Sequence, residues 1–211
     1  MMRQNLGQLF RTLVAMVAVI SLPAVALAAI TGTSHDFSGA GWNSVSGEIC
    51  IVCHTPHNAD STVTTAPLWN HEVTTATYSV YTSDTLNATT GQPDGVSLLC
   101  LSCHDGTVAI DSFAGNTGSI FITGDADVGT DLRDDHPISF VWTDAGIGAE
   151  DNGLNSVTDA SGLGGTIDED MLFGTKMQCA SCHDAHGVAT VPYFLVKSNA
   201  ASDLCLTCHN K

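Results

Sequence analysis

Every cysteine of this 211-residue chain lies in one of four copies of the pentapeptide Cys-x-x-Cys-His, at 50–54, 100–104, 179–183 and 205–209. Two thiols at this spacing can form thioether bonds to the two vinyl groups of one porphyrin, and the histidine that follows can bind the iron. The pattern therefore predicts four covalently attached haem c groups. The predicted attachment residues are Cys50, Cys53, Cys100, Cys103, Cys179, Cys182, Cys205 and Cys208. The predicted proximal iron ligands are His54, His104, His183 and His209.

Two other uses of the cysteines have to be compared with haem attachment. Two Cys-x-x-Cys pairs can form a four-thiolate zinc site, and the last two pairs have a spacing similar to that of a zinc ribbon. A disulfide framework would suit an exported chain. Neither zinc nor disulfides require a histidine directly after every second cysteine, although the chain has only 9 histidines in all. The sequence therefore favours haem over both alternatives.

The histidines outside the four motifs are the candidates for the second axial ligand of each iron. They are His35, His57, His71, His136 and His186. Four irons with two histidine ligands each need four of these five, which leaves one histidine spare. Beyond the first 28 residues the methionines are Met171 and Met177, and Met177 lies too close to Cys179 to reach the far face of that haem easily. Bis-histidine ligation is therefore expected at all four irons. It leaves no open position on the iron and suits electron transfer at a low potential.

Two of these candidates, His57 and His186, lie three residues after a proximal histidine. On a helical turn, residues three apart project from the same face, so neither can reach the opposite side of its own motif's haem. Each is therefore expected to bind a different iron and to hold two haems close together. His186 is expected to serve the haem on Cys205 and Cys208. His57 is expected to serve another haem of this chain or one of a neighbouring protomer.

The segments that must position these residues are poor in large apolar side chains. Aromatic residues make up only 6% of the chain and charged residues 13%, so the porphyrins would have to supply much of the buried apolar mass. We expect a mostly irregular coil fold with short helices and minor strands, wrapped around a haem stack, with a possible strand at 77–81. Residues 29–211 are expected to form one tetrahaem domain. Its predicted parts are a haem pair at 50–112, a Gly- and Asp-rich loop region at 113–170 and a haem pair at 171–211, and a solvated acidic loop is favoured over a calcium site at 125–135.

The first 28 residues have the pattern of a secretion signal. Arg3 and Arg11 precede an apolar stretch at 13–20, and an A-x-A cleavage site follows at 26–28. A retained membrane anchor is the alternative, although the apolar stretch is short for a membrane span. Cleavage would change the formal charge from −16 to −18, which disfavours nucleic acid and anionic lipid and favours cationic or redox partners. The chain is therefore expected to be exported, to the periplasm or outside the cell, with no membrane span after cleavage.

Beyond the four motifs, several short stretches carry a family resemblance. They are Ser34-His35-Asp36-Phe37, the run 50–57, Pro67-Leu68-Trp69-Asn70-His71, the run 99–105, Asp135-His136-Pro137-Ile138 and the run 179–187. In these the chain resembles the multihaem cytochromes c with paired CxxCH motifs, and most of all the tetrahaem extracellular nanowire cytochromes of metal-reducing bacteria. The resemblance implies a coil fold around a continuous stack of bis-histidine haems. It also implies that His57 binds a haem of the next protomer, as a histidine does in filament-forming relatives.

Three functions compete at this stage. The first is a polymerising extracellular electron conduit that passes electrons to metal oxides or other external acceptors. The second is a monomeric periplasmic electron carrier, or the cytochrome subunit of a respiratory complex. The third is a multihaem reductase with one five-coordinate catalytic haem, which is disfavoured because the histidines suffice to close every iron. An electron-transfer protein is therefore expected rather than an enzyme.

Overall fold

The computed structural model describes residues 30–43, 47–142, 153–187 and 191–210, so the predicted signal peptide lies outside the described residues. Turns and loops make up most of the described chain. Its α-helices are α2 (Gly95–His104), α3 (Ile167–Met171) and α4 (Asp203–Cys208), and its strands are β1 (Phe140–Val141) and β2 (Lys176–Met177). Six short 3₁₀ turns complete the regular structure: η1 (Phe37–Gly39), η2 (Gly41–Asn43), η3 (Gly124–Ala126), η5 (Cys179–Ser181), η6 (Pro192–Phe194) and η7 (Ala200–Ser202).

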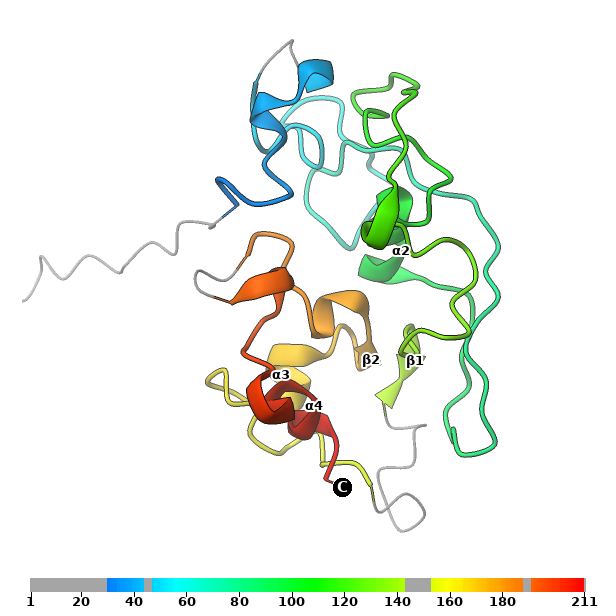
Figure 1. Ribbon diagram of the computed structural model, residues 1–211, viewed down its shortest axis with the longest axis vertical. Coiled ribbons are helices and arrows are strands. Elements are labelled where there is room, and N and C mark those ends of the chain that lie inside the picture. Colours follow the sequence, from blue (N-terminus) through cyan, green and yellow to red (C-terminus); the bar gives the residue numbers. More distant parts are fainter. Residues whose placement is uncertain (1–29, 44–46, 143–152, 188–190, 211) are drawn as a thin grey trace, which may run out of the picture.

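One small antiparallel sheet joins the middle of the chain to the segment before the third motif. In it Phe140 pairs with Met177 and Val141 with Lys176. Figure 1 shows β1 and β2 below α2, with the yellow to red C-terminal segments beside them. The strand expected at 77–81 does not form, because Ser79 makes a single bridge with Asp131 and its neighbours make no ladder.

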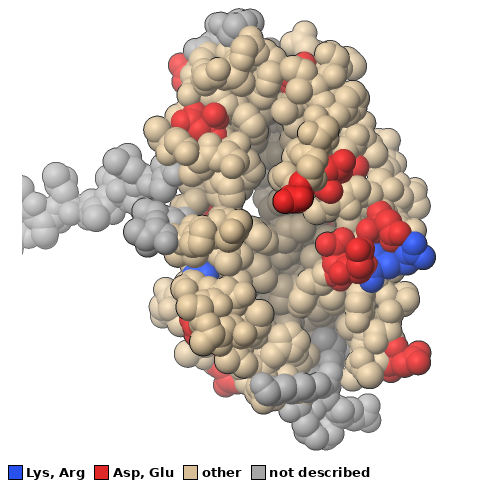
Figure 2. Space-filling model, viewed as in Figure 1, with Lys and Arg blue, Asp and Glu red and all other residues tan. Residues whose placement is uncertain are grey.

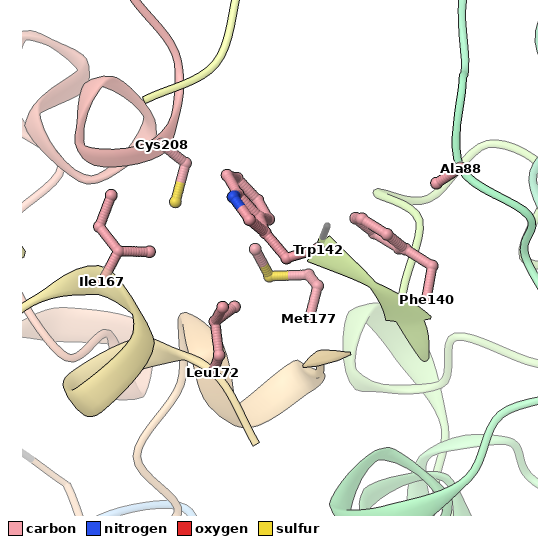
Figure 3. Close-up of a cluster of buried hydrophobic side chains, with 7 residues drawn as sticks. All are labelled: Ala88, Phe140, Trp142, Ile167, Leu172, Met177 and Cys208. Atoms are coloured by element: carbon pink, nitrogen blue, oxygen red, sulfur yellow. The ribbon is translucent and has the colours of Figure 1, made fainter. Parts of the chain in front are cut away.

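The largest buried apolar cluster surrounds this sheet and includes a cysteine of the fourth motif. Its members are Ala88, Phe140, Trp142, Ile167, Leu172, Met177 and Cys208. In Figure 3 the Trp142 ring lies between Phe140 and Cys208, with Met177 and Leu172 below it. A second, smaller cluster is formed by Tyr78, Leu101 and Leu132 around α2. Both clusters therefore pack against segments that carry a Cys-x-x-Cys-His motif.

The surface carries few positive charges, and those of the described chain are paired. Arg133 pairs with Asp131, Lys176 with Asp94 and Lys197 with Asp203. Figure 2 shows acidic side chains outnumbering basic ones on this face, and a hollow in its middle. Within the described residues, no helix is both long enough and apolar enough to cross a membrane.

Candidate haem sites

All four motifs fold into the same local turn. The backbone N–H of the histidine donates to the carbonyl of the first cysteine at distances of 2.8, 3.0 and 2.9 Å for His54, His183 and His209, and His104 is the last residue of α2. In such a turn, residues three and four apart project from one face. Each motif therefore presents its two thiols and its imidazole on the same side, which is the arrangement that a covalently attached haem needs.

The imidazoles of three motifs are oriented by a backbone carbonyl from a later loop. The Nδ1 atom of His54 lies 2.7 Å from the Pro67 carbonyl oxygen, that of His104 lies 2.7 Å from Ala126, and that of His183 lies 3.0 Å from Tyr193. A carbonyl at Nδ1 fixes the ring and leaves Nε2 with its lone pair, as is usual for a histidine that binds a metal. These side chains therefore fit axial ligation of iron through Nε2.

The loops that supply two of these carbonyls are the same structure built twice. In the first motif, Thr55 N–H donates to Leu68 (2.9 Å) and Asn70 N–H to Cys53 (2.9 Å). In the third motif, the corresponding bonds run from Asp184 to Phe194 (2.7 Å) and from Val196 to Cys182 (2.9 Å).

Further features repeat in the same register. His54 forms a bridge with Trp69, and His183 forms one with Leu195. Leu68 and Phe194 both have a positive φ, of 55° and 57°. The segment 67–71 therefore corresponds to 193–197, although the two share almost no sequence, and sequence comparison alone gives no signal for this repeat.

Three of the five remaining histidines approach a motif histidine at one common distance. The ring centres are 6.3 Å apart for His186 and His54, 6.1 Å for His35 and His104, and 6.3 Å for His136 and His209. Two imidazoles on opposite sides of one metal, each with a bond of about 2 Å, have their ring centres about 6 Å apart. The ring planes differ by 20°, 59° and 75°, which trans ligation permits because each ring can rotate about its own metal bond.

The contacts of the ring nitrogens of His35, His136 and His186 agree with that arrangement. Nδ1 of His35 lies 3.0 Å from the Ala185 carbonyl, Nδ1 of His136 lies 2.9 Å from the Pro137 carbonyl, and Nδ1 of His186 lies 3.6 Å from a carboxylate oxygen of Asp184. In each ring the contact is made through Nδ1, so that Nε2 is left for a metal. Burial lowers the pKa of His35. The hydrogen bond with the Ala185 carbonyl acts to raise this pKa, and the charges of His104 and His186 act to lower it further. This favours the neutral ring that metals bind.

His186 lies beside the first motif, whereas the order of the chain suggested the fourth. Its ring partner is His54 of the first motif, whereas we expected it to serve the haem on Cys205 and Cys208. The reason is that the segment after the third motif folds back toward the N-terminal residues, where the Ala185 carbonyl binds His35. One ring pair therefore joins the first and third motifs, across most of the chain.

Burial and neighbouring groups shift the pKa of several motif thiols. Burial raises the pKa of Cys103 to about 12, and the charge of Cys53 adds to this rise. A hydrogen bond between the thiols of Cys100 and Cys179 raises the pKa of Cys100 and lowers that of Cys179. Burial also raises the pKa of Cys208 to about 11, with the charge of Cys182 as the next cause.

The second and third motifs are also joined through their backbones. Cys179 N–H donates to Ser97 Oγ at 2.9 Å, and Ser97 N–H donates to Gln178 Oε1 at 3.2 Å. The start of α2 therefore lies directly against η5. This contact places the central pair of motifs side by side.

Three histidines remain outside these ring pairs. His183 has its Tyr193 carbonyl but no ring partner among the described residues. His57 is exposed, and only its backbone makes hydrogen bonds, to the Thr55 side chain. His71 is 2% exposed and contacts the second motif. The structure thus brings together three of the five candidates with motif histidines and leaves His57 and His71 apart.

The alternative sites were zinc, disulfides and calcium. All eight cysteines lie in the described chain, and none forms a disulfide. Over residues 30–43, 47–142, 153–187 and 191–210, no three His, Cys, Asp or Glu side chains group as ligands of a metal ion. In the acidic run, Asp131 instead pairs with Arg133, and Asp127 accepts the Gly129 N–H.

Comparison with known families supports one class of cofactor. Residues 173–211 match the family described as "Doubled CXXCH motif". This match supports a multihaem c-type cytochrome. It covers the third and fourth motifs and therefore indicates covalently bound haem c and a role in electron transfer. No curated protein sequence matches the chain.

Proposed function

We propose that the protein is an exported tetrahaem c-type cytochrome whose haems form one electron-transfer chain. The observation that carries this proposal is the common distance of about 6 Å between three motif histidines and three others, which is the spacing of axial ligands on one metal. The proposed ligand pairs are His54 with His186, His104 with His35, and His209 with His136. When bound, haem c supplies reversible one-electron chemistry.

The chain's own residues would set the order of electron transfer. Hydrogen bonds between the start of α2 and η5 support a position of the second motif directly beside the third. Carbonyls at Nδ1 hold the imidazoles in place, so that little has to move when an electron arrives. Imidazole on both sides of an iron closes the site to substrate and favours a low potential. This supports electron transfer over catalysis by a reductase.

The third motif is the proposed point of contact with a second copy of the chain. His183 has no ring partner in the described chain, and His57 is exposed on the segment that follows His54. We propose that His57 of one protomer completes the site of His183 in the next, which would make a polymerising extracellular conduit. A monomeric periplasmic carrier, or a cytochrome subunit of a respiratory complex, is the alternative. Redox proteins or extracellular metal acceptors are the proposed partners, and the strong negative charge favours cationic ones.

Two measurements test this function. The haem content of the exported protein, measured as the pyridine haemochrome, should be four per chain; two per chain would refute the tetrahaem assignment. Electron paramagnetic resonance of the assembled protein should show low-spin ferric iron. The His57→Ala variant should stay monomeric and gain a high-spin signal from about a quarter of its iron. Unchanged assembly and spin state in His57→Ala would refute the role of His57.

A further inference from the structure

His71 differs from every other histidine of the chain. The structure describes all nine, and His71 alone is buried, at 2% exposure. Both of its ring nitrogens face backbone carbonyls: Nδ1 lies 2.8 Å from Glu72 and Nε2 lies 3.1 Å from Ala109. By contrast, the rings of His35, His54, His104 and His136 contact a backbone carbonyl through Nδ1. In His71, the nitrogen that would bind iron contacts a carbonyl of the fold itself.

The segment that carries His71 fixes its place at the second motif. His71 forms an antiparallel bridge with Phe113, and Glu72 N–H donates to the Ser112 carbonyl at 2.9 Å. Nε2 of His71 also lies 3.5 Å from the sulfur of Cys103. His71 therefore joins the loop that follows α2 to the cysteine that would hold the second haem.

The repeated loop gives His71 a counterpart. In the register that matches 67–71 with 193–197, His71 corresponds to Lys197. Lys197 Nζ donates to Thr207 Oγ1 at 3.0 Å and to the Ser161 carbonyl at 3.3 Å. Thr207 directly precedes Cys208, and the charge of Lys197 acts on the Cys208 thiol. In each half, the equivalent position thus carries a nitrogen donor beside the second cysteine of the next motif.

We propose that His71 is the spare histidine and not an axial ligand. It is a positioning residue that holds the loop at 109–113 against Cys103, as Lys197 holds its neighbours at Cys208. This inference rests on the proposed tetrahaem function. Nε2 of His71 lies 3.1 Å from the Ala109 carbonyl, which also accepts the Ser112 N–H at 2.9 Å, so the ring is tied to the turn at 109–112. The loop then fixes the thioether edge of the second haem and the polarity around it, which is one of the means by which a protein sets a haem potential.

Two variants of His71 test the proposal in the full-length exported protein. His71→Gln keeps an amide donor that can reach the Ala109 carbonyl, whereas His71→Leu has no polar group. Both variants are expected to keep four haems per chain and an entirely low-spin spectrum. In His71→Leu, the reduction equilibrium of one haem should change by up to tenfold, which is 59 mV for one electron. His71→Gln should restore most of this change.

Two results with these variants would refute the proposal. A high-spin signal from about a quarter of the iron in His71→Gln would make His71 a ligand. Unchanged midpoint potentials at all haems in His71→Leu would refute a role at the second haem. His35→Ala is the control, because loss of a proposed ligand should produce the high-spin signal. A chain that binds no haem at all would refute the proposed function itself, and is distinguished by the haem assay.

Discussion

His186→Ala tests the assignment that depends most on tertiary structure. The structure pairs His186 with His54 at 6.3 Å, whereas chain order would pair it with the fourth motif. If the pair binds one of four irons, the variant should convert about a quarter of the iron from low to high spin. Haem content should not change, because Cys50 and Cys53 hold the porphyrin by covalent bonds.

The stability of the fold should change as well. An iron bridge between residues 54 and 186 closes a loop of about 130 residues, and loss of such a crosslink removes up to about 5 kcal/mol in the chain-entropy treatment. The other haems also crosslink the unfolded chain, so this bridge closes a shorter free loop and the measured loss of stability should lie below that figure. Denaturant unfolding followed by circular dichroism measures it, with Ser198→Ala in an exposed turn as the matched control.

Deleting single haems identifies the partner of His186. In a background with Cys50→Ser and Cys53→Ser, the iron of His54 is absent, so adding His186→Ala should produce no further high-spin signal. In a background with Cys205→Ser and Cys208→Ser, the same change should convert about a third of the remaining iron. The opposite pattern would refute the pairing drawn from the structure and restore the pairing with the fourth motif.

Two further predictions concern the fold. Ile167 is completely buried at 0% exposure, so Ile167→Ala should lower the free energy of unfolding by about 2–5 kcal/mol. The control Leu163→Ala, at 40% exposure, should change it by less than about 0.5 kcal/mol. Equal losses of the two variants in denaturant titrations would contradict the packing described. Burial acts to raise the pKa of Asp94, but the hydrogen bonds from Lys176 and Gln178 outweigh it and lower that pKa. A carboxyl with a lowered folded pKa stabilises the protein above about pH 4 and loses that contribution as the pH falls through the folded value. The Asp94 side chain is 47% exposed, so Asp94→Asn should lower the free energy of unfolding at neutral pH by less than about 1 kcal/mol and should weaken its dependence on acid pH. Asp84→Asn is the exposed control. An unchanged pH profile of unfolding in Asp94→Asn would count against the ion pair.

The cofactor class could be predicted from the sequence because attachment chemistry is local. Cys179, Cys182 and His183 lie within five residues, and one helical turn is enough to place them on one face. The family match at 173–211 confirms the c-type cytochrome interpretation for that part of the chain. The prediction that His57 and His186 do not serve their own motifs came from the spacing of residues on a helical turn. The ring of His186 lies 6.3 Å from that of His54, and the iron that His57 serves stays a prediction.

Regular structure was harder to predict from local patterns. The expected strand at 77–81 has suitable residue types, but the segment finds no partner strand over its length and makes one bridge instead. Strand formation depends on a neighbour, which local sequence does not specify. The repeat of 67–71 at 193–197 was missed for a related reason, since it is carried by backbone hydrogen bonds that almost unrelated side chains can share.

By itself, then, the sequence determined which residues have the spacing to hold haem, and it predicted five histidine candidates for four axial positions. Only the tertiary structure separated those five. The ring pair of His54 and His186 is made by segments far apart in the chain, and its formation depends on how the loops fold back. The burial of His71 and its two carbonyl contacts are likewise products of packing. Ligand type is a property of single residues, whereas ligand pairing is a property of distances that only the folded chain sets.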